Sequence, residues 1–180
     1  MKLNLKDFVI RTWKETDRVS LQKHANNRKV WANLRDLFPH PYTLEDARWW
    51  INHAQEETPE CSFAIANEEG IIGGIGLILQ EDIHQYSAEL GYWLAEPYWG
   101  QGIMTEAVMS ITEYAFIQYP LIRIFAGPFS HNIASQRVLE KAGYQKEGLL
   151  RNHVIKDGQI LHQVLYVWFL TFSATDSIDC

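Results

Sequence analysis

The chain has 180 residues, of which 47% are hydrophobic and 21% are charged, so we expect one ordinary globular domain. Its 22 acidic residues outnumber its 16 basic ones and give a net charge of −6. This balance argues against sequence-independent binding to nucleic acid, because the phosphates of DNA and RNA require a basic surface. It also raises the question of what would hold an anionic cofactor.

Neither the cysteines nor the N-terminal residues indicate a secreted or membrane protein. Cys61 and Cys180 lie outside any CxxC or Cys/His cluster, and we interpret both as free thiols in a reducing compartment. The first residues lack the long apolar core and the cleavage site of a signal peptide. No apolar run approaches the ~20 residues that span a bilayer. We therefore expect a soluble cytoplasmic protein with no membrane partner.

The first third of the chain is predicted to hold an edge strand and two helical segments. Residues 6–12 alternate in polarity as an edge strand does, and residues 16–35 show weak helical spacing. Two prolines exclude a helix over 37–42. The segment 43–57 is predicted to be a helix with Thr43 as its N-cap, because an acidic residue follows three positions later.

The rest of the chain is predicted to contain most of the strands. Strands are predicted over 62–67, 71–79, 86–94, 122–129, 144–150, 154–156 and 159–169, and helices over 103–119 and from Asn132 to Gly143. Asp157 and Gly158 suit a type I′ hairpin turn. The predicted fold class is α+β (mixed α/β), with a mostly antiparallel sheet of six or seven strands and about four helices on both faces. We expect one domain over 1–172 and a loose tail over 173–180.

The stretch 86–119 is the most informative part of the sequence. Gly100 and Gly102 would let the backbone approach a ligand closely. The helix predicted to begin at Ile103 presents unpaired N–H groups and the positive end of its dipole, which bind phosphate without a basic side chain. The loop is not a Walker A motif, and Thr105 stands where a dinucleotide fingerprint has its third glycine. Taken alone, such glycines also fit a plain turn.

Four motifs follow one another at separations that are typical of one protein family. They are Gly91-Tyr92-Trp93-Leu94, the run from Trp99 to Ala107, Asn132-x-x-Ser135 and Gly143-Tyr144. Together they resemble the GNAT superfamily of N-acetyltransferases, in particular its ribosomal-protein N-terminal alanine/serine acetyltransferase branch. The resemblance covers about residues 6–170. It implies the GNAT acyl-CoA N-acyltransferase fold, acetyl-CoA as acetyl donor and an amine as acceptor.

The resemblance also implies which residues hold the cofactor. The pyrophosphate would be bound by backbone N–H groups of the glycine loop, and the pantetheine arm would pair with a strand end. The implied cofactor-binding residues are Leu94, Gln101, Gly102, Ile103, Met104, Thr105, Asn132 and Ser135. Two positions depart from the family pattern: Trp99 stands where Arg or Gln usually begins the loop, and Leu139 stands where many members carry a general-acid tyrosine. For Asn132, the role of a plain N-cap fits equally well.

Acetylation of an amine requires the neutral amine, which separates the possible acceptors. An α-amino group of pKa ~7.8 is about 14% neutral at pH 7, whereas a lysine amine of pKa ~10.4 is about 0.04% neutral. A weak base therefore suffices for a protein N-terminus. Glu89 is the candidate base, and Ser135 is the candidate hydrogen-bond donor to the departing sulfur. The alternatives are a solvated or Arg/Lys-paired role for Glu89 and a local helix hydrogen bond for Ser135.

Two groups of residues are candidates for binding the acceptor. A two-residue turn places His153 opposite His162, where the pair could border the acceptor groove of the family or only pack across the strands. No third ligand lies at a suitable spacing, so we expect no metal site. The second group is aromatic, flanks the proline-broken segment and could equally belong to the core: Trp31, Phe38 and Tyr42.

The leading hypothesis is direct transfer of the acetyl group from acetyl-CoA to a primary amine in a ternary complex. The expected acceptor is a protein N-terminal α-amino group, and the expected oligomeric state is a monomer or a homodimer. Two alternatives stay open. The acceptor could be a small amine, such as a polyamine, an amino acid or an aminoglycoside, or the chain could be a non-catalytic acyl-CoA-binding module.

Overall fold

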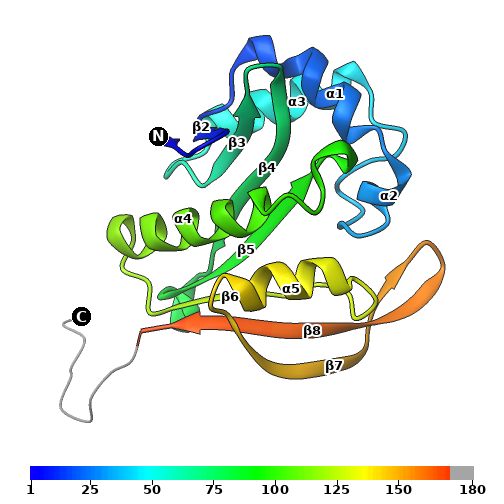
Figure 1. Cartoon of the computed structure of the whole chain (residues 1–180). Coiled ribbons are helices and arrows are strands. Elements are labelled where there is room, and N and C mark those ends of the chain that lie inside the picture. Colours follow the sequence, from blue (N-terminus) through cyan, green and yellow to red (C-terminus); the bar gives the residue numbers. More distant parts are fainter. Residues whose placement is uncertain (171–180) are drawn as a thin grey trace.

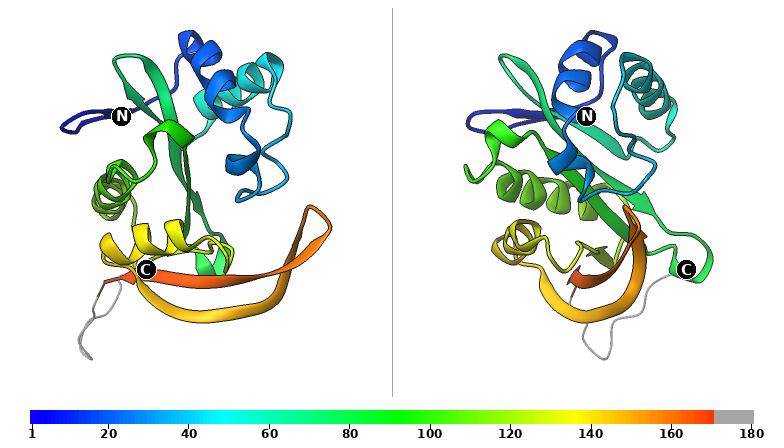
Figure 2. Two further views of the ribbon diagram at one scale, coloured as in Figure 1. Left: turned by 45° about the vertical axis from the view of Figure 1, so that its right-hand side comes forward. Right: turned by 90° about the vertical axis from the view of Figure 1, so that its right-hand side faces the viewer.

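An eight-stranded sheet forms the frame of the computed structural model, which describes residues 1–170. The strand order is β1-β2-β3-β4-β5-β6-β8-β7, and helices cover both faces of the sheet (Figure 1, Figure 2). The predicted domain end at 172 and the predicted tail over 173–180 lie outside the described residues. Within residues 1–170, none of the helices combines the length and the apolarity that crossing a membrane would require.

The elements confirm the mixed α/β class, with more strands and one more helix than predicted. The strands are β1 (Lys2–Asn4), β2 (Val9–Arg11), β3 (Ser62–Asn67), β4 (Gly70–Leu79), β5 (Ser87–Leu94), β6 (Arg123–Ala126), β7 (Gln145–Lys156) and β8 (Gln159–Phe169). The α-helices are α1 (Arg18–Ala25), α2 (Arg28–Trp31), α3 (Leu44–Glu56), α4 (Ile103–Gln118) and α5 (Ile133–Lys141). Short 3₁₀ helices are η1 (Glu15–Asp17), η2 (Asp82–His84) and η3 (Glu96–Tyr98).

Two strand predictions were wrong in detail. The segment predicted as an edge strand contains β2, which pairs on its outer side with β1, so that β1 is the edge of the sheet. The strand predicted over 122–129 already ends at Ala126. Beyond that point Pro128 has no N–H to donate to a ladder, and the side-chain amide of Gln163 donates to the Gly127 carbonyl at 2.7 Å.

The two faces of the sheet carry separate apolar layers, and β5 contributes to both. Its residues Leu90 and Leu94 are buried in the layer that α4 and α5 cover. Trp93 packs into the opposite layer, beneath α1 and α3. Because side chains alternate along a strand, Glu89 lies on the same face as Trp93. The sequence alternation of β5 therefore predicted the direction of this carboxylate.

Helix α3 begins with the capping box that the sequence predicted. The Thr43 hydroxyl oxygen accepts the Asp46 backbone N–H at 3.2 Å, and the Asp46 carboxylate accepts the Thr43 N–H at 2.7 Å. We expect Thr43→Ala to lower the free energy of unfolding by about 1 kcal/mol, because it leaves a first-turn N–H without its partner. Urea denaturation measures this, with Thr16→Ala at an exposed threonine of η1 as control. Equal urea midpoints for the two variants would contradict a stabilising cap.

Cys61 is a free thiol, as the sequence predicted, and the structure shows that it is buried. Burial raises the pKa of this thiol, although a hydrogen bond with Tyr119 partly opposes the effect. Cys180 lies outside the described residues. Cys61 is therefore a core residue with low reactivity.

Candidate active site

The central strands β5 and β6 part from each other halfway along β5. They are the one parallel pair among the described strands, and their ladder covers only residues 87–89 of β5 and 123–125 of β6. β5 then continues to Leu94, whereas β6 ends at Ala126. The sheet is thus split between the C-terminal half of β5 and the segment that follows β6.

The free edge of β5 directs backbone hydrogen-bonding groups into this split. The Ala95 N–H donates to the Ile72 carbonyl at 2.8 Å, so the odd-numbered residues of this strand bond to β4. The even-numbered residues from 90 to 94 therefore turn their N–H and C=O groups toward the split. One of these groups already has a partner, because the Trp99 indole N–H donates to the Leu94 carbonyl at 2.7 Å. A peptide-like chain can thus pair with the groups of this free edge that precede the Leu94 carbonyl in the strand.

The glycine loop at the end of β5 leads directly into α4. Gly100 and Gly102 have φ values of +75° and +83°, the left-handed region that favours glycine. A Cβ atom on Gly102 would meet no other atom within 4 Å, so the space in front of the helix is open. The first helical bond runs from the Glu106 N–H to the Gly102 carbonyl at 3.1 Å. The N–H groups of residues 103–105 are therefore available to an anion, which fits the pyrophosphate of an acyl-CoA.

Helix α5 is tied to β5 across the split by a pair of hydroxyl groups. Asn132 is the N-cap of α5 and accepts the Ser135 N–H at 3.1 Å, which confirms its capping role. The Ser135 hydroxyl lies 2.8 Å from the Tyr92 hydroxyl, and Tyr92 also reaches the Ser135 carbonyl at 3.3 Å. Burial raises the pKa of Tyr92, so the phenol keeps its proton. Leu139, at the position of the family's tyrosine, is fully buried.

A role of the Tyr92 side chain in the site was not predicted from the sequence. One signal was present, because Tyr92 falls on the buried face of the predicted strand and a buried phenol requires a hydrogen-bond partner. The partner itself could not be read from the sequence, since it lies on a separate helix.

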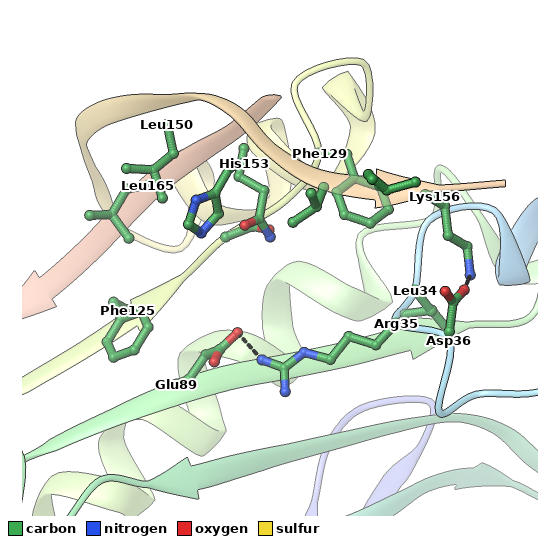
Figure 3. A pocket seen from close by; sticks show the side chains of 14 residues that line it. Leu34, Arg35, Asp36, Glu89, Phe125, Phe129, Leu150, His153, Lys156 and Leu165 are labelled. Carbon is green, nitrogen blue, oxygen red and sulfur yellow. Dashed lines mark hydrogen bonds and ion pairs between the residues drawn. The ribbon is translucent and has the colours of Figure 1, made fainter. Parts of the chain in front are cut away.

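A pocket of about 420 Å³ lies on the face of the sheet that carries Glu89 (Figure 3). Its walls come from residues 34–36, from β6 and the segment after it, and from the β7–β8 hairpin. The apolar part of the lining consists mainly of Leu34, Phe125, Phe129, Leu150 and Leu165. A hydrocarbon group can therefore be buried next to the carboxylate of Glu89.

Two ion pairs lie in this pocket. Glu89, with 25% of its side chain exposed, is paired with Arg35, with 57% exposed. Lys156 is only 4% exposed, and its Nζ lies 2.6 Å from an Asp36 carboxylate oxygen and 3.7 Å from the centre of the Trp31 ring. Figure 3 shows Arg35 reaching along the pocket to Glu89, with His153 on the facing side. The arginine pairing that the sequence left open for Glu89 is thus present, and inside the pocket.

The two histidines predicted to lie opposite each other are in an irregular part of the hairpin. The ladder between β7 and β8 keeps the predicted register from the turn to Val154 and Leu161, and it shifts between Leu150 and Val154, where His153 lies. His153 lines the pocket. The His162 ring nitrogen Nδ1 instead accepts the backbone N–H of Asn152 at 2.9 Å. Among the described residues, no group of three His, Cys, Asp or Glu side chains is arranged to hold a metal ion.

None of the three aromatic candidates for an acceptor wall lines the pocket. Tyr42 is 4% exposed and belongs to the core beneath α3. Phe38 packs on Tyr42 and Trp93, with ring centres 4.9 and 5.7 Å away. Trp31 is nearest to the pocket, beneath the Lys156 ammonium. Residues 34–36, which lie between these aromatics in the sequence and were not predicted, line the pocket instead.

Comparison with known proteins identifies the family. Residues 7–145 match the family described as the Acetyltransferase (GNAT) domain. The chain belongs to the GNAT acetyltransferases. The "Probable N-acetyltransferase YjcK" of Bacillus subtilis is 40% identical to this GNAT chain over 132 residues, which are 70% of this chain and 73% of that protein. The [ribosomal protein uS5]-alanine N-acetyltransferase of Escherichia coli is 26% identical over 174 residues, covering 92% and 89% of the two chains.

A solved structure supports the same fold. RimL, a ribosomal L7/L12 alpha-N-protein acetyltransferase in complex with coenzyme A, superposes with a TM-score of 0.83 at 19% identity, covering 94% of this chain and 98% of that one. This likeness confirms the GNAT fold. The family and its curated relatives show that the chain is an acetyl-CoA-dependent N-acetyltransferase, an acyltransferase.

Proposed function

We propose that this GNAT acetyltransferase transfers the acetyl group of acetyl-CoA directly to the α-amino group of a protein N-terminus, within a ternary complex. The observation that carries the proposal is the position of Glu89. It lies where β5 and β6 begin to part, and its carboxylate points into a partly apolar pocket. The glycine loop lies at the far end of the same strand, so one strand would serve both substrates. The curated relative that acts on ribosomal protein uS5 supports a protein acceptor.

The donor side of the site would use backbone groups of the split. The N–H groups at the start of α4 would hold the pyrophosphate, and the free edge of β5 would pair with the pantetheine arm. When bound, acetyl-CoA supplies an acetyl group activated as a thioester. The Ser135 hydroxyl, held by Tyr92, would keep a proton at the place where the leaving thiolate forms.

The acceptor side would use Glu89 to take the proton that the amine loses. This carboxylate is partly exposed and paired with Arg35, so an acceptor that is already partly neutral suits it best. The pKa gap of ~2.6 between a lysine amine and an α-amino group is worth roughly 3.5 kcal/mol in the cost of forming the neutral amine. The proposed acceptor is therefore an N-terminus rather than a lysine side chain.

Thiol release from acetyl-CoA with a panel of amines tests the acceptor. The panel contains peptides that begin with Ala or Ser, an N-terminally blocked peptide with an internal lysine, spermidine and an aminoglycoside. We expect the Ala and Ser peptides to exceed the blocked lysine peptide in kcat/KM by about 100-fold or more at pH 7, because far more of their amine is neutral. Higher kcat/KM with spermidine or the aminoglycoside would contradict the protein acceptor. Saturable cofactor binding without release by any amine would indicate a non-catalytic module.

A further inference from the structure

Residues 27–36, which comprise α2 and the turn after it, form a strap that is tied at both ends. At one end the Asn27 side-chain amide donates to the Glu96 carboxylate at 2.9 Å, just before the glycine loop. At the other end Asp36 pairs with Lys156 on the β7–β8 hairpin, whose tip lies beside α2 in Figure 1 and Figure 2. The two ends hold the strap over the pocket, and Arg35 lies directly beside the second anchor.

Arg35 is the residue of the strap whose charge reaches Glu89. The guanidinium therefore sits on the carboxylate to which the proposed function assigns the proton of the acceptor amine. Arg35 is paired with one of the two oxygens of this carboxylate. An amine that arrives as an ammonium cation competes with the guanidinium for the charge of Glu89, so that one cation is exchanged for another.

We propose that Arg35 is a specificity-determining residue: the acceptor amine must displace it from Glu89, and its displaced charge then disfavours acceptors that carry a second cation. The proposal rests on the proposed function of Glu89. The exchange is feasible because more than half of the Arg35 side chain is exposed, and exposed ion pairs are weak.

The remaining charges of the pocket explain the selection against a second cation. Its lining residues include two carboxylates, and once the amine is bound Glu89 and Asp36 are both engaged. The displaced Arg35 and the buried Lys156 are then the neighbouring cations. A second ammonium group of the acceptor would then lie near like charges and find no free carboxylate to pair with. Such repulsion between like charges is a common way for binding sites to exclude wrong partners. A hydrocarbon group is accepted by the apolar walls.

Butylamine and 1,4-diaminobutane are matched probes, because they share a four-carbon chain and differ in one amine. We expect Arg35→Gln to lower the KM of butylamine about two- to fivefold, the range that an exposed ion pair allows. We expect a larger fall for the diamine, so that the ratio of diamine to monoamine kcat/KM rises about threefold or more. Arg35→Lys should stay within about twofold of the wild type, because it keeps the competing charge.

Arg28→Gln is the matched control. Arg28 belongs to the same strap, is 59% exposed and pairs with Asp157 of the hairpin turn, outside the pocket lining. Arg28→Gln should leave unchanged the KM values of butylamine and of 1,4-diaminobutane. It should also leave unchanged the ratio of diamine to monoamine kcat/KM. A raised amine KM in Arg35→Gln would show that Arg35 binds the acceptor, and an unchanged ratio would show that it does not select; either result overturns the proposal.

A binding measurement separates this proposal from the proposed function. If the wild type transfers acetyl groups to none of the amines, the proposed function fails. Calorimetric titration with butylamine alone still tests Arg35, because displacement requires no turnover. Tighter binding of butylamine to Arg35→Gln than to the wild type supports displacement, and equal binding overturns it.

Discussion

Replacing Gly102 with valine is expected to weaken acetyl-CoA binding by about 100-fold or more, which corresponds to about 2.7 kcal/mol. Gly102 has a φ of +83°, and its Cβ position faces open space in front of α4. A valine side chain would occupy the room that the pyrophosphate requires. It would also strain the loop that aligns the N–H groups of residues 103–105. Isothermal titration calorimetry with acetyl-CoA measures the loss.

Gly158→Val is the control for backbone strain. Gly158 also has a left-handed φ, +74°, and open space at its Cβ, but it lies in the β7–β8 turn. Both variants should lose about 1–2 kcal/mol of stability or more, because an L-residue is strained in this conformation. Only the Gly102 variant should lose cofactor affinity. Wild-type affinity in Gly102→Val, or an equal loss of affinity in both variants, would reject the binding of the pyrophosphate at the glycine loop.

The parts of the site that depend on local order could be predicted from the sequence. The alternation along β5 placed Glu89 opposite Leu90 and Leu94, and the structure agrees. The paired glycines before α4 indicated a left-handed loop at a helix start, and both have positive φ values. These features follow from strand periodicity and from glycine stereochemistry, which act within a few residues.

The parts that depend on contacts between distant segments could not be predicted. Arg35 and Glu89 form an ion pair because the strap of residues 27–36 folds over the sheet. No sequence feature near either residue indicates that the other is its partner. The ladder of β7 shifts register between Leu150 and Val154, where His153 lies, although the Asp157-Gly158 turn has the φ values of type I′, +51° and +74°. A turn fixes the register only up to the first irregularity in the ladder.

The acidic net charge of −6 is compatible with an anionic cofactor. Between residues 97 and 119 the charged residues are Glu106 and Glu113, so the loop has no basic side chain to offer. The open start of α4 supplies backbone N–H groups and the positive end of the helix dipole instead. These attract an anion although they add nothing to the net charge. The cations that do lie near the site, Arg35 and Lys156, line the pocket beside Glu89.

Replacing Glu89 with glutamine is expected to lower kcat with an Ala-initiated peptide by about 100-fold at pH 7, within the range for loss of a general base. The amide keeps the shape of the side chain but cannot take the proton. The remaining activity should rise with pH toward the amine pKa of ~7.8, because the neutral fraction of an α-amine grows as pH rises. The ratio of wild-type to variant kcat should therefore narrow from pH 6 to 9, as steady-state thiol release would show.

Glu147→Gln is the matched control for this variant. Glu147 is also a sheet carboxylate paired with an arginine, Arg123, at 2.9 Å, but it lies outside the pocket lining. It should keep the wild-type kcat and pH profile, and both variants should keep the wild-type KM for acetyl-CoA. Unchanged kinetics of Glu89→Gln across pH 6–9 would remove Glu89 from proton transfer. A loss confined to the KM of the peptide would assign it to acceptor binding, because removal of a proton acceptor must lower kcat.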